Sequence, residues 1–151
     1  MKRIIFTLAT LFCFSWVNAQ TLIYQSGKSS PIYRYDGEVL YAGSSPDAAG
    51  AKRYMCTATE TYAGFNFSCN PTISIQKDKI YKDGTYTDSN WLLTLDYKGK
   101  RIYKKGTSED VFYFDGKKLK QGDEYSGRTV LEADKEVPLA VMLTVFYDVM
   151  K

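Results

Sequence analysis

A short motif recurs along the chain, in which an apolar residue is followed by tyrosine and, two or three residues later, by glycine. A fifth, degenerate copy has lysine in place of tyrosine. Tyrosine and β-branched residues favour strands, whereas glycine marks turns, so each copy predicts the end of a strand followed by a reversal of the chain. The copies begin at Ile23, Leu40, Ile80, Ile102 and Leu119.

The spacing of the motif extends this pattern to hairpins. The step from one copy to the next is seventeen residues in two places, from 23 to 40 and from 102 to 119. Inside these steps lie Asp36-Gly37 and Asp115-Gly116, and Lys98-Gly99 holds the equivalent place between them. Such dipeptides accept the positive φ of tight hairpin turns. We therefore expect a mainly-β fold of antiparallel tandem β-hairpins, arranged as a meander, a small barrel or a hairpin stack.

The period is broken between about 44 and 79, where we expect an insertion. Its first part is a loop of small residues, and its second part contains Cys56 and Cys69. If 61–64 form a four-residue hairpin loop, Cys56 faces Cys69, which predicts a disulfide that clamps a hairpin. The alternative, a redox-active pair, is less favoured because the two cysteines do not form a C-x-x-C motif.

The C-terminal segment has a different character, because residues 138–150 are almost wholly apolar. One set of residues is spaced as a single helical stripe: Leu139, Met142, Leu143, Phe146 and Met150. Another set alternates as in a strand: Leu139, Val141, Leu143, Val145, Tyr147 and Val149. Pro138 suits the start of a helix, and the length of the segment also favours one. We therefore expect a C-terminal α-helix packed on the sheet, with a strand as the alternative.

The N-terminus has the three parts of a cleavable secretory signal over residues 1–19. Lys2 and Arg3 are cationic, residues 4–16 are mostly apolar, and 17–19 end in Ala19. The apolar stretch is too short to span a bilayer. We expect an exported protein, periplasmic or extracellular, whose residues 20–151 form a single β-rich domain without a membrane span.

The amino-acid composition argues against several classes of function. Without the two basic residues of the signal, the chain has 18 basic and 17 acidic residues, so its overall charge gives no reason to expect a nucleic-acid partner. Histidine, the usual general base and commonest metal ligand, is absent. No phosphate-binding loop or hydrolytic triad is recognisable, and the carboxylates fit turns or solvated strands. We therefore expect a non-catalytic protein with no cofactor and no metal site.

The remaining asymmetry is a basic segment interleaved with tyrosines. If its hairpins are neighbours, several cations share one face, which could attract an anionic polymer or an acidic partner. The alternative is a solvated face on which lysines prevent edge-to-edge association. An exposed tyrosine or tryptophan could also stack on a sugar. The candidate binding face comprises Lys98, Lys100, Arg101, Tyr103, Lys104, Lys105, Lys117, Lys118, Lys120 and Trp91.

Residues 111–116, followed by Gly122, resemble the Tyr/Gly hairpin repeats of choline- and glucan-binding modules. The likeness covers about a dozen residues and lacks the tryptophans of those modules, so we attribute it to shared hairpin geometry and assign no family. The functional hypothesis is an exported binding protein for an envelope glycan or anionic polymer. The alternative is a protein-interaction module, such as an inhibitor or immunity-type partner of a secreted enzyme.

Overall fold

The computed structural model describes residues 20–43, 53–64, 67, 69–84, 86–96 and 98–150. The predicted export signal and the small-residue loop at 44–52 lie outside this part of the chain. The described elements are twelve strands and one helix. Their bounds are β1 Thr21–Gln25, β2 Tyr33–Tyr35, β3 Val39–Ala42, β4 Arg53–Cys56, β5 Glu60–Ala63, β6 Ile73–Gln76, β7 Lys79–Lys82, β8 Trp91–Leu95, β9 Arg101–Lys104, β10 Asp110–Phe114, β11 Lys118–Gln121, β12 Arg128–Ala133 and α1 Leu139–Val149.

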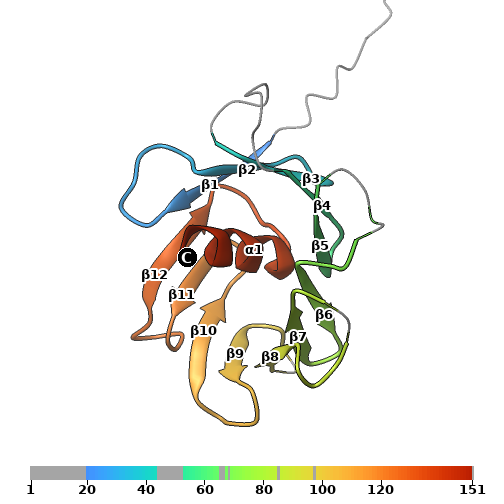
Figure 1. Cartoon of the computed structure of the whole chain (residues 1–151). Coiled ribbons are helices and arrows are strands. Elements are labelled where there is room, and N and C mark those ends of the chain that lie inside the picture. Colours follow the sequence, from blue (N-terminus) through green and yellow to red (C-terminus); the bar gives the residue numbers. More distant parts are fainter. Residues whose placement is uncertain are drawn as a thin grey trace, which may run out of the picture.

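The strands form a closed antiparallel barrel in which each strand pairs with its neighbours in sequence (Figure 1). The ring closes between the first strand and the last, where Ile23 lies opposite Ala133. This confirms the expected mainly-β fold of tandem hairpins, and of the three arrangements considered it is the barrel that forms. Closure means that none of the twelve described strands is an edge strand.

The recurring motif marks where each strand meets the interior. The first residue of every copy is completely buried in the core: Ile23, Leu40, Ile80, Ile102 and Leu119. Successive residues of a strand point to opposite faces, so the residue after each of them lies on the outer face of the wall. The copies therefore supply the barrel with a uniform aliphatic lining and a wall rich in tyrosine.

Two of the predicted turns share one local structure. Gly37 and Gly116 lie between paired strands with φ of 106° and 102°, a backbone region that favours glycine. The carboxylate of the preceding Asp36 accepts bonds from the amides of residues 38 and 39, and Asp115 does the same for 117 and 118. Gly99, with φ of 70°, lies in the turn between β8 and β9.

Helix α1 lies inside the ring of strands and fills it (Figure 1). Every residue from Leu139 to Val145 is buried, and the core cluster joins them to residues of the strands around the ring. A helix that is apolar on all sides belongs in an interior rather than on a surface. The predicted helix is thus confirmed, but the single apolar stripe is wrong. The helical and the strand spacing both matched residues 138–150 because nearly every position in this segment is apolar.

Two polar contacts fix the helix within the apolar interior. The hydroxyls of Thr144 and Thr61, on β5, are 2.6 Å apart and both side chains are buried. Nearer the end of the helix, Asp148 accepts hydrogen bonds from the hydroxyls of Tyr33 and Tyr54. Burial and the hydrogen bond to Asp148 both raise the pKa of Tyr33. These hydrogen bonds orient the helix relative to strands β2, β4 and β5.

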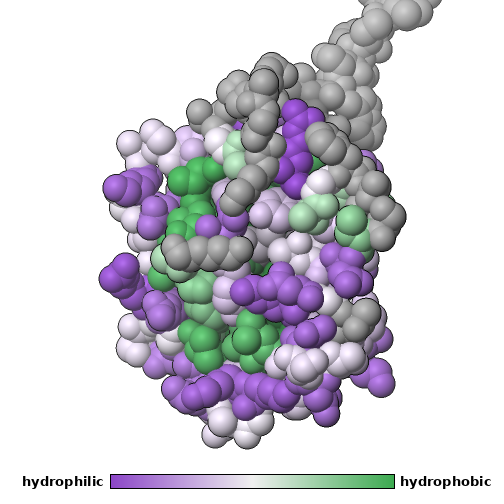
Figure 2. Space-filling model, in the orientation of Figure 1, coloured by the Kyte–Doolittle hydropathy of each residue, from purple (hydrophilic) through white to green (hydrophobic). Residues whose placement is uncertain are grey.

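The last turn of the helix reaches the surface. Phe146 and Val149 are partly buried, and Met150 is 43 % exposed. In the orientation of Figure 1, the surface shows several hydrophobic groups with hydrophilic residues around them (Figure 2). No helix in the part of the chain that the structure describes has the length and apolar character needed to cross a membrane.

The cysteine region differs from the predicted hairpin. Residues 60–63 form β5 rather than a loop, and Cys56 lies opposite Thr61 instead of Cys69. The strands described within 44–79 belong to the wall of the same barrel. Both cysteines are free thiols in the structure, Cys56 buried and Cys69 exposed. The disulfide itself remains a prediction from the sequence.

Candidate binding groove on the outer wall

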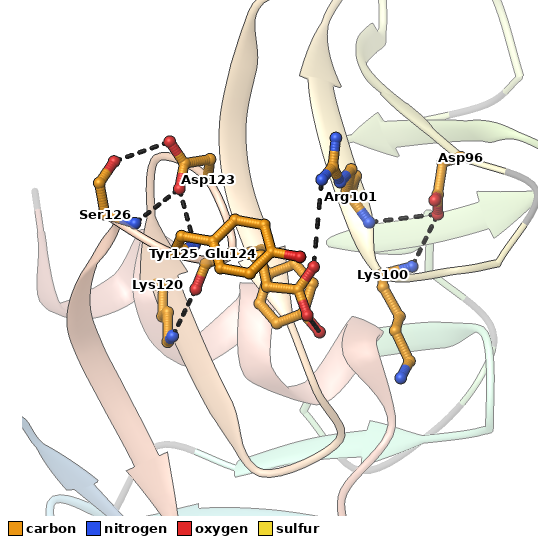
Figure 3. Close-up of polar contacts among 9 residues, drawn as sticks. Asp96, Lys100, Arg101, Lys120, Asp123, Glu124, Tyr125 and Ser126 are labelled. Atoms are coloured by element: carbon orange, nitrogen blue, oxygen red, sulfur yellow. Dashed lines mark hydrogen bonds and ion pairs between the residues drawn. The ribbon is translucent and has the colours of Figure 1, made fainter.

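A groove of about 460 Å³ lies on the outer face of the barrel. Its volume is in the range of about 300–1,000 Å³ that is usual for small-molecule sites. One side is formed by the β8–β9 turn and the other by the β11–β12 loop (Figure 3). The lining residues are Asp96, Lys98, Lys100, Arg101, Tyr103, Tyr113, Glu124 and Tyr125.

Strand register brings the floor of the groove together. Tyr113 on β10 lies opposite Arg101 on β9 and opposite Lys120 on β11, so these three side chains share the outer face. Tyr103 lies two residues beyond Arg101 on the same face. The inward-facing neighbours Ile102 and Phe112 belong to the core, which anchors the floor to the barrel.

The β11–β12 loop, residues 122–127, folds back over this floor. Asp123 holds its shape, because the carboxylate accepts hydrogen bonds from the amides of Tyr125 and Ser126 and from the Ser126 hydroxyl (Figure 3). The hydrogen bond from the Ser126 amide, followed by the one from the Ser126 hydroxyl, lowers the pKa of Asp123 most. Tyr125, at the tip, is 86 % exposed. The turn therefore presents an aromatic ring to solvent on a fixed backbone.

Glu124 ties the loop to the wall. Its carboxylate accepts a hydrogen bond of 3.1 Å from the Tyr113 hydroxyl and lies 4.0 Å from Nη2 of Arg101. Its backbone carbonyl accepts a bond of 2.7 Å from Nζ of Lys120. Three wall strands thus hold one loop residue, while the neighbouring Tyr125 stays largely exposed.

The opposite side of the groove is also braced by a carboxylate. Oδ1 of Asp96 accepts hydrogen bonds from the backbone amides of Lys100 and Arg101, at 2.8 and 3.1 Å. These bonds fix the start of β9 and leave the side chains of both residues outside the turn. Lys100 is exposed, and among the described residues its ammonium has no hydrogen-bond or ion-pair partner.

The guanidinium of Arg101 lies between the two sides of the groove. Its pKa is raised, chiefly by a hydrogen bond to the Tyr103 side chain and further by the charges of Asp110 and Glu124. The side chain is still 40 % exposed, and its contact with Glu124 is long. Arg101 is therefore a permanent cation that is exposed enough for a ligand to contact it.

The structure divides the predicted binding face. Lys98, Lys100, Arg101 and Tyr103 line the groove, and Lys120 supports its loop. The others lie elsewhere. Lys104 pairs with Glu109 at 3.9 Å, Lys118 pairs with Glu132 at 3.1 Å, and Lys117 is exposed in the β10–β11 turn.

Trp91 belongs to a different part of the wall. Its indole donates a hydrogen bond of 2.8 Å to the carbonyl of Leu93, and Nζ of Lys79 and of Lys105 lie 4.2 and 4.9 Å from its ring centroid. Lys105 also donates to the carbonyl of Asp88. Two ammonium groups over one ring occupy the surface that a sugar would stack on.

Four groove residues are absent from the sequence-based selection: Asp96, Tyr113, Glu124 and Tyr125. Two of them, Glu124 and Tyr125, lie in one loop. The signal that could have indicated them is the segment Gly122-Asp-Glu-Tyr-Ser-Gly127, in which turn residues and two glycines flank a lone tyrosine. A Cβ at Gly127 would lie 2.3 Å from the carbonyl oxygen of Asp123, so the loop closes only with glycine there.

Comparison with known proteins adds no relative: no family model, curated protein or solved structure matches the chain. Among the residues that the structure describes, no group of three or more acidic or cysteine side chains is placed to hold a metal ion. The groove itself therefore carries the functional argument.

Proposed function

We propose that the protein is an exported, non-catalytic binding protein that holds a saccharide of the cell envelope in the outer groove. The observation that supports this most is Tyr125. A tyrosine left 86 % exposed at the tip of a loop braced by its own hydrogen bonds loses little conformational freedom when a ligand covers it. Its ring offers apolar area and its hydroxyl a hydrogen bond.

The floor complements such a platform. Tyr103 adds a second, partly buried phenol ring, Tyr113 lies largely buried beneath the loop, and Arg101 and Lys100 add donors on the facing side. A saccharide presents flat C–H faces and hydroxyl groups, so aromatic rings interleaved with polar groups suit it better than a purely apolar cleft would. The cations also suit an anionic envelope polymer.

The test is a binding titration with envelope oligosaccharides and a matched pair of variants. We expect Tyr125→Ala to weaken binding roughly tenfold and to leave the unfolding transition unchanged, because its ring packs on little. Tyr86→Ala is the control, since Tyr86 is 47 % exposed on the β7–β8 loop.

Equal affinities for both variants would overturn the groove as the site. Absence of saccharide binding, together with stoichiometric capture of one secreted protein by the wild-type chain, would overturn the saccharide proposal. That result would favour the protein-interaction module instead.

A further inference from the structure

We infer that the saccharide is acidic, of the uronic acid type, and that its carboxylate binds Arg101 in the place that Glu124 approaches. This inference rests on the proposed function and adds the ligand class. The supporting observation is that the charged side chains around the groove differ in how many hydrogen bonds and ion pairs they already make.

The two carboxylates of the groove differ in how much of their bonding capacity is already used. Asp96 is committed to the backbone amides that start β9. Glu124 is committed only in part, because its carboxylate has one bond to Tyr113 and a contact of 4.0 Å to Arg101. A charge-assisted hydrogen bond is much shorter, at about 2.7–2.9 Å. The pair is therefore loose.

The cations have more capacity than these carboxylates use. A guanidinium can bind a carboxylate through two parallel N–H groups, and Glu124 takes up neither at bonding distance. Lys100, next in sequence and on the same side, has no side-chain partner among the described residues. An added carboxylate would meet two cations on one rim.

Glu124 shows what chemical group this position accepts. Its side chain is a carboxylate that reaches the groove from the loop and lies between a guanidinium and a phenol hydroxyl. Both partners are donors, and both suit a planar anion. A sugar ring stacked on the neighbouring Tyr125 would bring its own carboxylate to this place, and its neutral counterpart would lack that contact.

The experiment compares oligogalacturonate with its methyl ester, which keeps the sugar rings and removes the charge. For the wild-type protein, isothermal titration should give an affinity for the acid that is ten- to a hundredfold higher. Arg101→Gln should reduce this preference to near unity, because it removes the guanidinium that only the acid can engage as an ion pair. Lys28→Gln, which removes an exposed lysine on the β1–β2 loop, is the charge-matched control.

Glu124→Gln gives a second, opposite readout. The amide keeps an acceptor for the Tyr113 hydroxyl but no longer competes for Arg101 or repels the ligand, so affinity for the acid should rise several-fold. The ratio of acid to ester affinity should therefore rise above that of the wild-type protein. A merely structural role for Glu124 would lower both affinities together.

The outcomes separate the two proposals. If acid and ester bind equally well and both depend on Tyr125, the acidic ligand class is wrong while the saccharide groove stands. If neither binds, the proposed function fails as well. If Lys28→Gln abolishes the preference as strongly as Arg101→Gln does, the attraction is non-specific and the Arg101 site is wrong.

Discussion

The interior and the outer wall of the barrel are made by the same strands, yet they differ in almost every physical respect. The interior is mainly apolar, with aliphatic and aromatic side chains, and is filled by α1, whose residues from Ala140 to Leu143 are inaccessible to solvent. The outer wall carries tyrosines and charges, and at β9–β11 it is hollowed into a groove. Barrels that bind small ligands often do so inside. Here the helix occupies that space.

This difference implies a division of labour between the two faces of a strand. Ile102 and Tyr103 are neighbours in sequence, but one belongs to the core and the other to the groove. Stability should then depend on the inward set and binding on the outward set. The following substitutions test that separation, beginning with the largest expected effect.

The strongest test of the interior is Leu143→Ala. Leu143 is a fully buried residue of α1, so its truncation leaves a cavity and should lower the free energy of unfolding by about 2–5 kcal/mol. Urea denaturation measures this loss. The affinity of the folded protein for its saccharide should not change, and a parallel loss of affinity would show that the two faces are coupled.

A smaller effect is expected at the buried hydroxyl pair. Thr144→Val leaves the Thr61 hydroxyl without its partner and should cost about 1–3 kcal/mol, whereas the double variant with Thr61→Val should recover most of this loss. Denaturation of the two single variants and the double variant forms the cycle. Additive losses would mean that the 2.6 Å contact contributes little.

On the outer wall, Gly127→Ala should act on binding more than on stability. Its methyl group would approach the Asp123 carbonyl oxygen to 2.3 Å, so the loop must shift and displace Tyr125 and Glu124. We expect affinity to fall about tenfold, a cost of about 1.4 kcal/mol, with little change in the urea midpoint. Unchanged affinity would show that the loop does not shape the site.

The smallest perturbation is chemical labelling of the two thiols. Burial raises the pKa of Cys56 to about 12, so at pH 8 this thiol is protonated and unreactive, whereas Cys69 is exposed. The native protein should react with one equivalent of a thiol reagent and the unfolded protein with two. Labelling should leave stability and binding unchanged. No reactive thiol in either state would favour the disulfide predicted from the sequence.

Much of the interior could be predicted from the sequence, and little of the groove. The apolar residue of each motif copy signals a strand position in the core, and the almost wholly apolar segment after Pro138 signals an element that packs on the sheet. Such patterns are local. By contrast, Glu124 meets Arg101 only because β9, β10 and β11 are neighbours and the loop folds back, and no local pattern records that.

The errors of the sequence-based predictions have the same cause, because local patterns do not record which strands become neighbours. Trp91 and Lys105 lie close in sequence to Lys98 and Arg101, but they pack together in a different part of the wall. The predicted cysteine hairpin counted residues outward from a turn at 61–64 that is in fact strand β5. A register error of this kind changes every pairing that follows from it.

The most direct test of the account is a titration with oligogalacturonate, followed by backbone amide chemical shifts. We expect the largest shifts at Arg101, Tyr113 and Tyr125 and none along Leu139–Val149, because the ligand lies outside a barrel whose interior is full. Shifts concentrated on the helix, or on a wall away from β9–β11, would contradict the central claim.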